Sequence, residues 1–454
     1  MLLGEWWVSN PSNATKAYEP PDPADRVPGT LREIAHGSFA LETIGFLGDR
    51  PPMAGGLDTS SDRAHPEIWG TDRSATCYSL FGNLRLNSTW SPGHVFDGYE
   101  DWQVGWLAKG DVWVLPDEEC TSARIHVDGL RSWALHRESN NVEFDYDRHA
   151  ATINLRHEVL GATTIGDVSV SLVRDSEATF GSPDQDPERH FSFANVVYWR
   201  VEGPVTLRAI VTDWCRHFES FVRFMTMDPS VVSGIKCDFS EVENRKPGVD
   251  LVVPRLPRGD QATDREVDEP SPHKYLATAR TLQELDIDPM VVLAGFWRRV
   301  AAGDAYTAMA LHLESQDRLL NRGPDGALLN AIRSVESLYA VHNPGARVEQ
   351  VSVQKKIDDA VSRASGVGIQ ILDAWPDLRR IGELRRDLAH GRSRPSAEFG
   401  LRCVGGAMAL QWIQRVQLLA ELGIGESTAR WIVSENFQYP WDLRNLQGWS
   451  AELV

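Results

Sequence analysis

Arg385 and His390, followed directly by Gly391, are the residues of this chain whose types and spacing best fit a chemical reaction. Histidine side chains exchange protons near neutral pH. Arginine side chains stabilise the negative charge that builds up on a phosphate. A histidine and an arginine at the end of a strongly helical segment could therefore carry metal-independent cleavage of RNA, and their surroundings must decide whether they do.

The spacing of this motif leaves open which arginine works with the histidine. On a helix, Arg386 lies four residues before His390 and shares its face. Arg385 lies five residues before His390, about 140° away around a helix of 3.6 residues per turn. Arg385 would therefore reach His390 only near a helix end or across a two-fold interface between two copies of the chain.

The segment around the motif is basic although the chain is acidic. The formal net charge of −18 argues against a protein that coats nucleic acid non-specifically, but it permits a small basic cleft. Between residues 377 and 394, six arginines face three acids, and a phosphate is expected at such a patch. The arginines are Arg379, Arg380, Arg385, Arg386, Arg392 and Arg394. The alternative is a solvated helix face with a histidine stabilised at a helix C-terminus.

The first half of the chain is predicted to be β-structure. Its short segments are rich in Val, Ile, Trp and Thr and are separated by Gly, Asp, Asn and Pro turns, which is typical of an antiparallel sandwich or barrel. The predicted strands are Phe39–Phe46, Thr76–Leu86, Trp102–Leu107, Ser122–Val127, Val142–Phe144, Ala151–Leu155, Val168–Val173, Phe191–Val201 and Val205–Val211, with a helix at 214–224 and one further short strand at Leu251–Val253.

The second half is predicted to be a helical bundle, because apolar residues recur there at helical spacing. The predicted helices are Pro289–Val300, Ala305–Leu320, Asp325–His342, Val351–Ala364, Gly366–Trp375, Pro376–His390, Phe399–Leu422 and Glu426–Glu435. The fold class is therefore multidomain β + α, with an N-terminal antiparallel β-rich sandwich or barrel-like domain at 1–240. A linker follows at 241–280, and the all-α bundle covers 281–454.

Composition bears on disulfides, metal sites and the cellular location of the protein. Five scattered cysteines without a CxxC pair predict reduced thiols, with neither a disulfide framework nor a zinc site. The acidic groups Asp117-Glu118-Glu119 and Asp286/Asp288 lack partner histidines at ligand spacing, so no metal site and no cofactor are expected. The chain lacks a signal-peptide pattern and a run of 18 apolar residues, so we expect a cytoplasmic protein that does not contact a membrane.

The helical half resembles the HEPN superfamily of ribonucleases and nucleotide-binding proteins. Their signature is an arginine, four to six residues, and a histidine, and Arg385 to His390 fits its Arg-x4-His form. The helix around Glu336 and Tyr339 resembles the first long helix of that family. The chain departs from the family at Arg386, where a polar or acidic residue is common. Either that role passes to Asp387, or Arg386 supplies a second phosphate contact.

The N-terminal half resembles the β-rich domain of ApeA-type antiphage proteins, which carry a C-terminal HEPN domain. The resemblance rests on Gly4-Glu5-Trp6-Trp7, Gly29-Thr30-Leu31, Leu41-Glu42-Thr43-Ile44-Gly45 and Ile68-Trp69-Gly70, in that order. It implies a regulatory or sensor domain that responds to a phage-encoded trigger. It also implies abortive-infection defence through cleavage of RNA, with tRNA as one candidate.

The resemblance further implies a dimer or higher homo-oligomer formed through the HEPN domain. The apolar helix Phe399–Leu422 is one candidate surface for it, although the same residues fit an intrachain core equally well. The implied reaction is attack of the ribose 2′-OH on its own phosphate, with Arg385 and His390 as catalytic residues. The predicted substrate-binding residues are Arg379, Arg386, Asp387, Arg392 and Glu336.

A second function from another class remains open. In that reading the helical bundle is a non-catalytic scaffold that binds nucleotide or RNA, and the chain is a phage sensor or adaptor. The Arg-x4-His motif favours the ribonuclease, whereas the unusual Arg386 leaves room for the scaffold.

Overall fold

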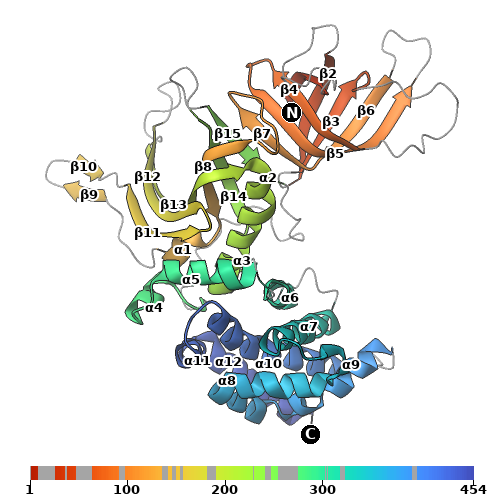
Figure 1. Ribbon diagram of the computed structural model, residues 1–454, viewed down its shortest axis with the longest axis vertical. Coiled ribbons are helices and arrows are strands. Elements are labelled where there is room, and N and C mark those ends of the chain that lie inside the picture. Colours follow the sequence, from red (N-terminus) through yellow and green to blue (C-terminus); the bar gives the residue numbers. More distant parts are fainter. Residues whose placement is uncertain are drawn as a thin grey trace.

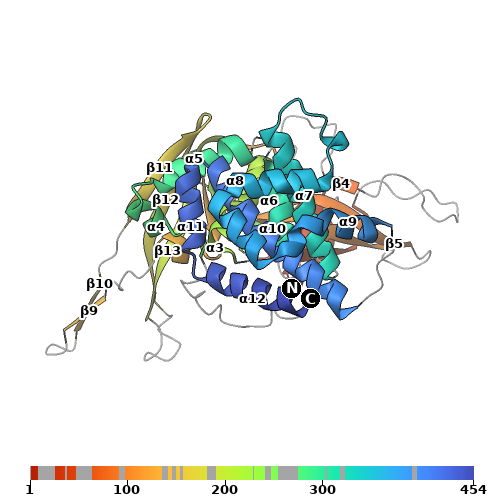
Figure 2. The same ribbon diagram turned by 90° about the horizontal axis from the view of Figure 1, so that it is seen from below.

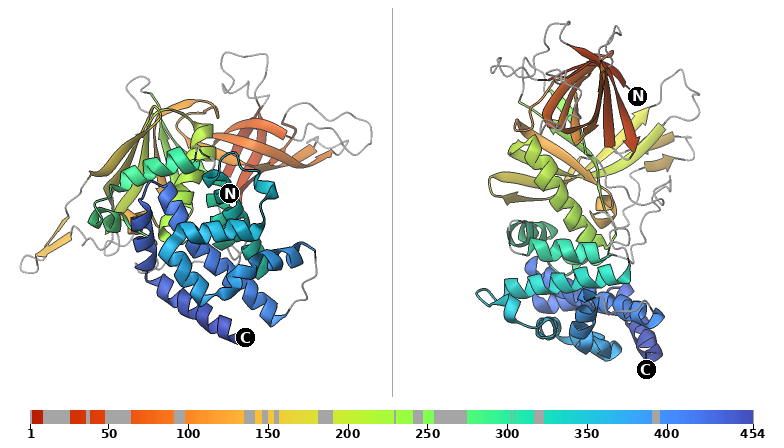
Figure 3. Two further views of the ribbon diagram at one scale, coloured as in Figure 1. Left: turned by 60° about the horizontal axis from the view of Figure 1, so that its bottom comes forward. Right: turned by 90° about the vertical axis from the view of Figure 1, so that its right-hand side faces the viewer.

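The protein consists of a β-barrel, an open β-sheet and a helical layer, which follow one another along its longest axis (Figure 1). A view from the side shows the same order (Figure 3). The computed structural model describes residues 2–8, 26–35, 38–47, 64–90, 98–134, 142–145, 150–153, 157–180, 191–228, 230–240, 247–253, 275–301, 303, 305–316, 323–390 and 396–453.

Six strands form the barrel, and all their pairings are antiparallel. They are β1 (Leu2–Trp7), β2 (Val27–Ala35), β3 (Ser38–Ile44), β4 (Ala64–Asp72), β5 (Cys77–Trp90) and β6 (Gly98–Val104). Their order is β5-β4-β1-β2-β3-β6, and β6 pairs back onto β5, so the barrel is closed. Closure removes the exposed strand edges on which other chains could pair.

The barrel has a hydrophobic core of its own, built around Trp6 and Trp102. A side chain at Gly70 would collide with the Trp6 ring, so only glycine leaves room for this indole. Trp6, which fills the barrel, and Gly70, which makes room for it, both belong to the N-terminal motifs of the sequence.

An open antiparallel sheet continues from the barrel because β5 also pairs with β7. Its strands are β7 (Trp106–Gly110), β8 (Glu119–Val127), β11 (Glu158–Ile165), β12 (Val168–Phe180), β13 (Phe191–Thr206), β14 (Val232–Asp238) and β15 (Gly248–Val252). Their spatial order is β11-β12-β13-β8-β14-β15-β7. A separate hairpin pairs β9 (Val142–Asp145) with β10 (Ala150–Ile153).

One face of the open sheet is covered by a helical segment that follows β13. The helix α2 (Leu207–Ala209) leads through a π-helical turn η2 (Ile210–Trp214) into α3 (Cys215–Thr226). The buried side of α3 includes Phe218 and Phe221, and Trp199 of β13 stacks on Phe218 with ring centroids 5.1 Å apart. A short helix α1 (Leu130–Ala134) adds Trp133 to the same core.

The C-terminal layer is helical. It contains α4 (Ala279–Glu284), α5 (Pro289–Gly295), η4 (Phe296–Ala301), α6 (Tyr306–Gln316), α7 (Pro324–His342), η5 (Val348–Gln350), α8 (Val353–Ala374), η6 (Pro376–Arg380), α9 (Ile381–Ala389), α10 (Ala397–Glu421), α11 (Glu426–Ser434) and α12 (Gln438–Glu452). No helix within the described residues has both the length and the apolar character needed to cross a membrane.

The open sheet and the helical layer share one continuous hydrophobic core. Polar contacts also join them: Trp133 Nε1 donates to the carbonyl of Ala277 at 2.9 Å, and Asn436 Nδ2 donates to the carbonyl of Tyr275 at 2.6 Å. Within the part of the chain that the structure describes, there are thus two hydrophobic cores, one in the barrel and one that spans the sheet and the helices. The sequence indicated instead a β domain and an α domain divided by a linker at 241–280.

The predicted two-part β + α architecture is confirmed. The predicted strands at Phe39–Phe46 and Ser122–Val127 correspond to β3 and β8, and the helix at 214–224 corresponds to α3. The predicted strand Val205–Val211 is wrong beyond residue 206, because Thr206 Oγ1 accepts a hydrogen bond from Ala209 N at 3.2 Å and starts a helix there.

The range 241–280, predicted as linker, contains the sheet strand β15 and the start of α4, while 254–274 lie outside the described residues. Within this range, the sequence predicted one short strand, at Leu251–Val253, and it overlaps β15. Helix α12 lies beyond the last helix expected from the sequence.

Candidate functional site

The motif lies on α9, a short helix at the outer end of the helical layer (Figure 1, Figure 2). Pro376 begins the preceding 3-10 turn η6, and α9 follows from Ile381 to Ala389. Ile381 and Trp375 are both buried at 1% exposure or less. They pack against α10 at Gly405 and Gly406, where a Cβ atom at Gly405 would lie 2.5 Å from the Trp375 ring. The two glycines thus let α9 approach α10 closely.

Gln354 of α8 fixes the junction between η6 and α9 through its side-chain amide. Its Nε2 donates to the carbonyl of Leu378 at 3.2 Å, and its Oε1 accepts from the backbone N–H of Gly382 at 3.3 Å. The Asp377 carboxylate adds an ion pair to Arg402 of α10 at 3.3 Å. The backbone that carries the motif is therefore held from both α8 and α10.

Glu336 of α7 connects the motif to a buried lysine. Its Oε1 accepts from Lys356 Nζ of α8 at 3.1 Å, and its Oε2 accepts from Arg385 Nη2 at 3.4 Å. The Lys356 side chain is 5% exposed, Glu336 is 20% exposed and Arg385 is 38% exposed. Since a buried ammonium needs a charged partner, Lys356 orients the carboxylate that in turn holds Arg385.

Among the residues that the structure describes, Arg385 uses little of its hydrogen-bonding capacity. A guanidinium carries five N–H donors, and the contact with Glu336 uses one of them. The remaining donors of this partly exposed side chain are available to a phosphate. Because the Glu336 carboxylate is engaged by two cations, its geometry favours a positioning role over the direct substrate contact expected from the sequence.

His390 caps the C-terminal end of α9. Its backbone N–H donates to the carbonyl of Arg386 at 3.1 Å, and its side chain is exposed. Within the described ranges, the imidazole makes no hydrogen bond and no ion pair. Both ring nitrogens are therefore accessible for proton transfer.

Several charged side chains near the motif form ion pairs with each other or with neighbouring helices. The charged side chains without such a partner are the ones available to a substrate. Arg380 pairs with Glu383 at 3.0 Å on the surface. By contrast, the exposed side chains of Arg379, Arg386 and Asp387 have no ion-pair partner among the residues that the structure describes. Two arginines and one acid without partners give this surface a net positive charge on an acidic protein. We call the surface formed by Arg379, Arg386 and Asp387 the tip.

Arg379 lies at a groove between α8 and η6. The groove has a volume of about 380 Å³, and its lining includes Gln354, Asp358 and Ser362 together with Arg379. The predicted substrate-binding residue Arg392 falls in 391–395, which lie outside the described residues.

The structure does not join Arg385 to His390 within one chain. No hydrogen bond between them is present, and five residues of helix turn the two side chains about 140° apart. Both nevertheless remain accessible from solvent. A reaction that uses both groups therefore requires that the substrate or a second copy of the chain bring them together.

The helix α10, one candidate dimer surface, is mostly used inside the chain. Leu410, Ile413, Val416 and Leu419 are buried in the shared core, and Val404 is its exposed large apolar side chain at 38%. The alternative expected from the sequence, an intrachain core, thus accounts for most of this helix.

Another histidine of the helical layer is buried and polar but closed to substrate. His312 Nδ1 lies 2.8 Å from Gln414 Oε1, and its Nε2 lies 2.6 Å from Gln316 Nε2. Desolvation, with smaller effects from nearby arginines, lowers the pKa of His312 to about 3. This neutral ring links α6 to α10 as a structural element. No group of three or more potential metal ligands occurs among the described residues.

Lys356 and Gln354 were missed by sequence reasoning. Lys356 lies one turn before Ala360 on the buried face of α8, so a lysine within an apolar stripe was the available signal for a buried ion pair. Gln354 carried no such signal, because a glutamine on a helix is usually solvated.

Comparisons with known proteins add no residue to this site. Neither the family models, nor the curated proteins, nor the solved structures contain a match to this chain. The candidate site therefore stands on its geometry and on the motif itself.

Proposed function

We propose that this chain is a metal-independent endoribonuclease with a HEPN-type helical domain, which cleaves RNA in abortive-infection antiphage defence. Its substrate is RNA, with tRNA as one candidate, because the reaction uses a ribose 2′-OH that DNA lacks. One observation carries the proposal: Glu336 holds Arg385 in the middle of α9, while the accessible imidazole of His390 lies at the C-terminal end of the same helix.

The chemistry assigned to these groups is a transesterification. The ribose 2′-oxygen forms a bond to its neighbouring phosphorus, and the bond from phosphorus to the 5′-oxygen breaks. One group removes the proton of the 2′-OH, and another protonates the departing 5′-oxygen. His390 takes one of these two roles, while Arg385 stabilises the charge of the crowded phosphorane. The products are a 2′,3′-cyclic phosphate and a 5′-hydroxyl.

Binding of the flanking nucleotides is assigned to the unpaired charges of the tip. Arg386 and Arg379 are exposed and have no ion-pair partner within the described part of the chain, so each can contact a phosphate without first breaking a salt bridge. The angle between Arg385 and His390 on α9 supports a composite cleft, in which a second copy supplies one of the two groups.

The direct test incubates the purified full chain with total bacterial RNA and maps the new 5′ ends. The His390→Ala variant serves as control, and each reaction is run with and without EDTA. We expect the wild-type protein to produce defined new ends in EDTA and the variant to produce none. Equal cleavage by both proteins, or cleavage abolished by EDTA, would contradict the proposal.

The competing function is a non-catalytic nucleotide- or RNA-binding scaffold. It predicts that a bacterial host grows equally well when it expresses wild type or His390→Ala at equal protein levels. The ribonuclease predicts slower growth with the wild type alone.

A further inference from the structure

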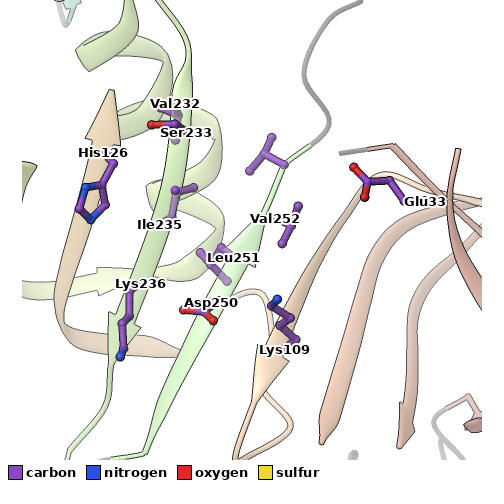
Figure 4. A pocket seen from close by; sticks show the side chains of 12 residues that line it. Glu33, Lys109, His126, Val232, Ser233, Ile235, Lys236, Asp250, Leu251 and Val252 are labelled. Carbon is purple, nitrogen blue, oxygen red and sulfur yellow. The ribbon is translucent and has the colours of Figure 1, made fainter. Parts of the chain in front are cut away.

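A cavity of about 630 Å³ lies on the face of the open sheet opposite α3, beside the barrel. Strands β7, β8, β14 and β15 line it, and Glu33 of the barrel strand β2 forms its far side (Figure 4). A volume of this size is typical of pockets that hold a small organic ligand.

Strand register places a row of alternating charges in this cavity. Asp250 of β15 pairs directly with Lys236 of β14 and with Lys109 of β7. Directly opposed residues in a sheet project to the same side, so the carboxylate lies between the two ammonium groups. Figure 4 shows the two lysines on either side of Asp250. Their chain neighbours Ile235 and Leu251 project to the other side and enter the core beneath α3.

These three charges are not used to hold the fold together. Lys109, Lys236 and Asp250 are exposed, and none of them makes an ion pair or a side-chain hydrogen bond with another described residue. The chain contains only seven lysines among its 46 basic residues. Two of the seven lysines are among the twelve residues that line this cavity. Lysines are therefore concentrated here relative to the rest of the chain.

A glycine opens the cavity at its inner surface. Gly234 of β14 is paired with His126 of β8. A Cβ atom at Gly234 would lie 3.7 Å from the His126 ring, an ordinary contact, and the backbone there is accessible to any residue. Glycine is therefore not required by the strand, and its effect is to leave space where a side chain would project.

We propose that this cavity binds a small phosphorylated sugar compound of nucleotide size. Lys109 and Lys236 donate hydrogen bonds to its phosphate, since an ammonium group is a common partner of phosphate. Asp250 and Glu33 accept hydrogen bonds from sugar hydroxyls, as carboxylates do for ribose in other nucleotide sites. The carboxylates disfavour a ligand that carries only negative groups, whereas a sugar phosphate matches both kinds of lining residue.

The test is calorimetric titration of the full chain with AMP, ribose 5-phosphate and inorganic phosphate. We expect saturable binding of AMP or ribose 5-phosphate, and weaker binding of inorganic phosphate. Lys236→Gln and Lys109→Gln should each weaken binding about tenfold or more, whereas the exposed Lys355→Gln should not. Gly234→Leu should abolish binding because it fills the cavity, and thermal unfolding of each variant checks its fold.

AMP and ribose 5-phosphate distinguish a nucleotide ligand from a simple sugar phosphate. Binding of AMP alone assigns a nucleotide, and equal binding of both assigns a sugar phosphate. If neither probe binds, or if both lysine variants bind as the wild type does, the proposal is overturned. The titration measures binding alone, so its result is independent of whether the chain cleaves RNA.

Discussion

Arg385 donates a hydrogen bond to Glu336 across 3.4 Å, from a helix of only nine residues to the long helix α7. The other carboxylate oxygen of Glu336 accepts from the buried Lys356. A chain of three charged groups therefore runs from the interior of the helical layer to the surface. In the proposed ribonuclease, this chain of charges would hold the guanidinium in place before the RNA binds, which is the preorganisation that electrostatic catalysis requires.

The first prediction concerns this chain of charges. Glu336→Gln should lower kcat for RNA cleavage by about tenfold with little change in KM, because Arg385 loses its charged partner and acts mainly in the transition state. Steady-state kinetics on a defined RNA measures both constants. The exposed Glu349→Gln is the matched control and should change neither constant. A rise in KM alone would instead identify Glu336 as a substrate contact.

The second prediction concerns Arg386, one of the two arginines near the motif that have no ion-pair partner among the described residues. Arg386→Gln should weaken RNA binding and reduce the slope of log affinity against log salt by about one, as expected for the loss of one phosphate contact. Filter binding at several salt concentrations measures this slope. Arg280→Gln removes an exposed arginine that is paired with Glu284, and it should leave the slope unchanged. Identical slopes for wild type and Arg386→Gln would remove this residue from the substrate path.

The third prediction concerns the glycine that admits Trp375. Gly405→Ala should lower the free energy of unfolding by about 1–3 kcal/mol, because the new methyl group overlaps a rigid buried indole. Gly400→Ala on the same helix meets no atom within 4 Å and should raise stability by about 0.5–1 kcal/mol through helix propensity. Denaturant unfolding measures both changes. Equal effects of the two substitutions would contradict the close approach of α10 to Trp375.

The fourth prediction concerns pH. The pKa of His312 is lowered to about 3 in the folded chain, whereas an unfolded histidine titrates near 6.5. The unfolded state therefore binds the extra proton first. The stability that the neutral ring provides is complete above pH 6.5 and decreases as the pH falls toward 3, by about 1.4 kcal/mol per unit.

His312→Gln removes this titration. Between pH 6.5 and 4.5, its free energy of unfolding should therefore depend less steeply on pH than that of the wild type, by about one proton. Urea unfolding at a series of pH values measures the difference. Parallel curves for the two proteins would show that His312 is not held neutral in the folded state.

The sequence predicts the motif helix and its neighbours well because periodic apolar positions determine them. Leu328, Ile332 and Val335 recur at helical spacing and are buried on α7, as expected. The break predicted between the helices Val351–Ala364 and Gly366–Trp375 is also confirmed, since Ser365 has a positive φ of 48° and kinks α8. The sequence pattern is enough to predict these features, because each depends only on residues that lie close together in the sequence.

Features that depend on partners distant in sequence could not be predicted in the same way. The ion pair of Lys356 with Glu336 joins residues 20 positions apart on different helices. The charge row of Lys109, Asp250 and Lys236 requires the strand order β7-β15-β14, and the sequence pattern did not reveal that order. Closure of the barrel through β5 and β6 likewise follows from pairing rather than from either strand alone.

The chemical structure of the RNA ends distinguishes metal-independent transesterification from other ways of cutting RNA. A defined RNA is incubated with the wild-type chain in EDTA, and the ends of the fragments are identified by mass spectrometry. We expect a 2′,3′-cyclic phosphate on one fragment and a 5′-hydroxyl on the other, with no fragments from His390→Ala or Arg385→Ala. Fragments that carry a 5′-phosphate and a 3′-hydroxyl, or undiminished cleavage by both variants, would contradict it.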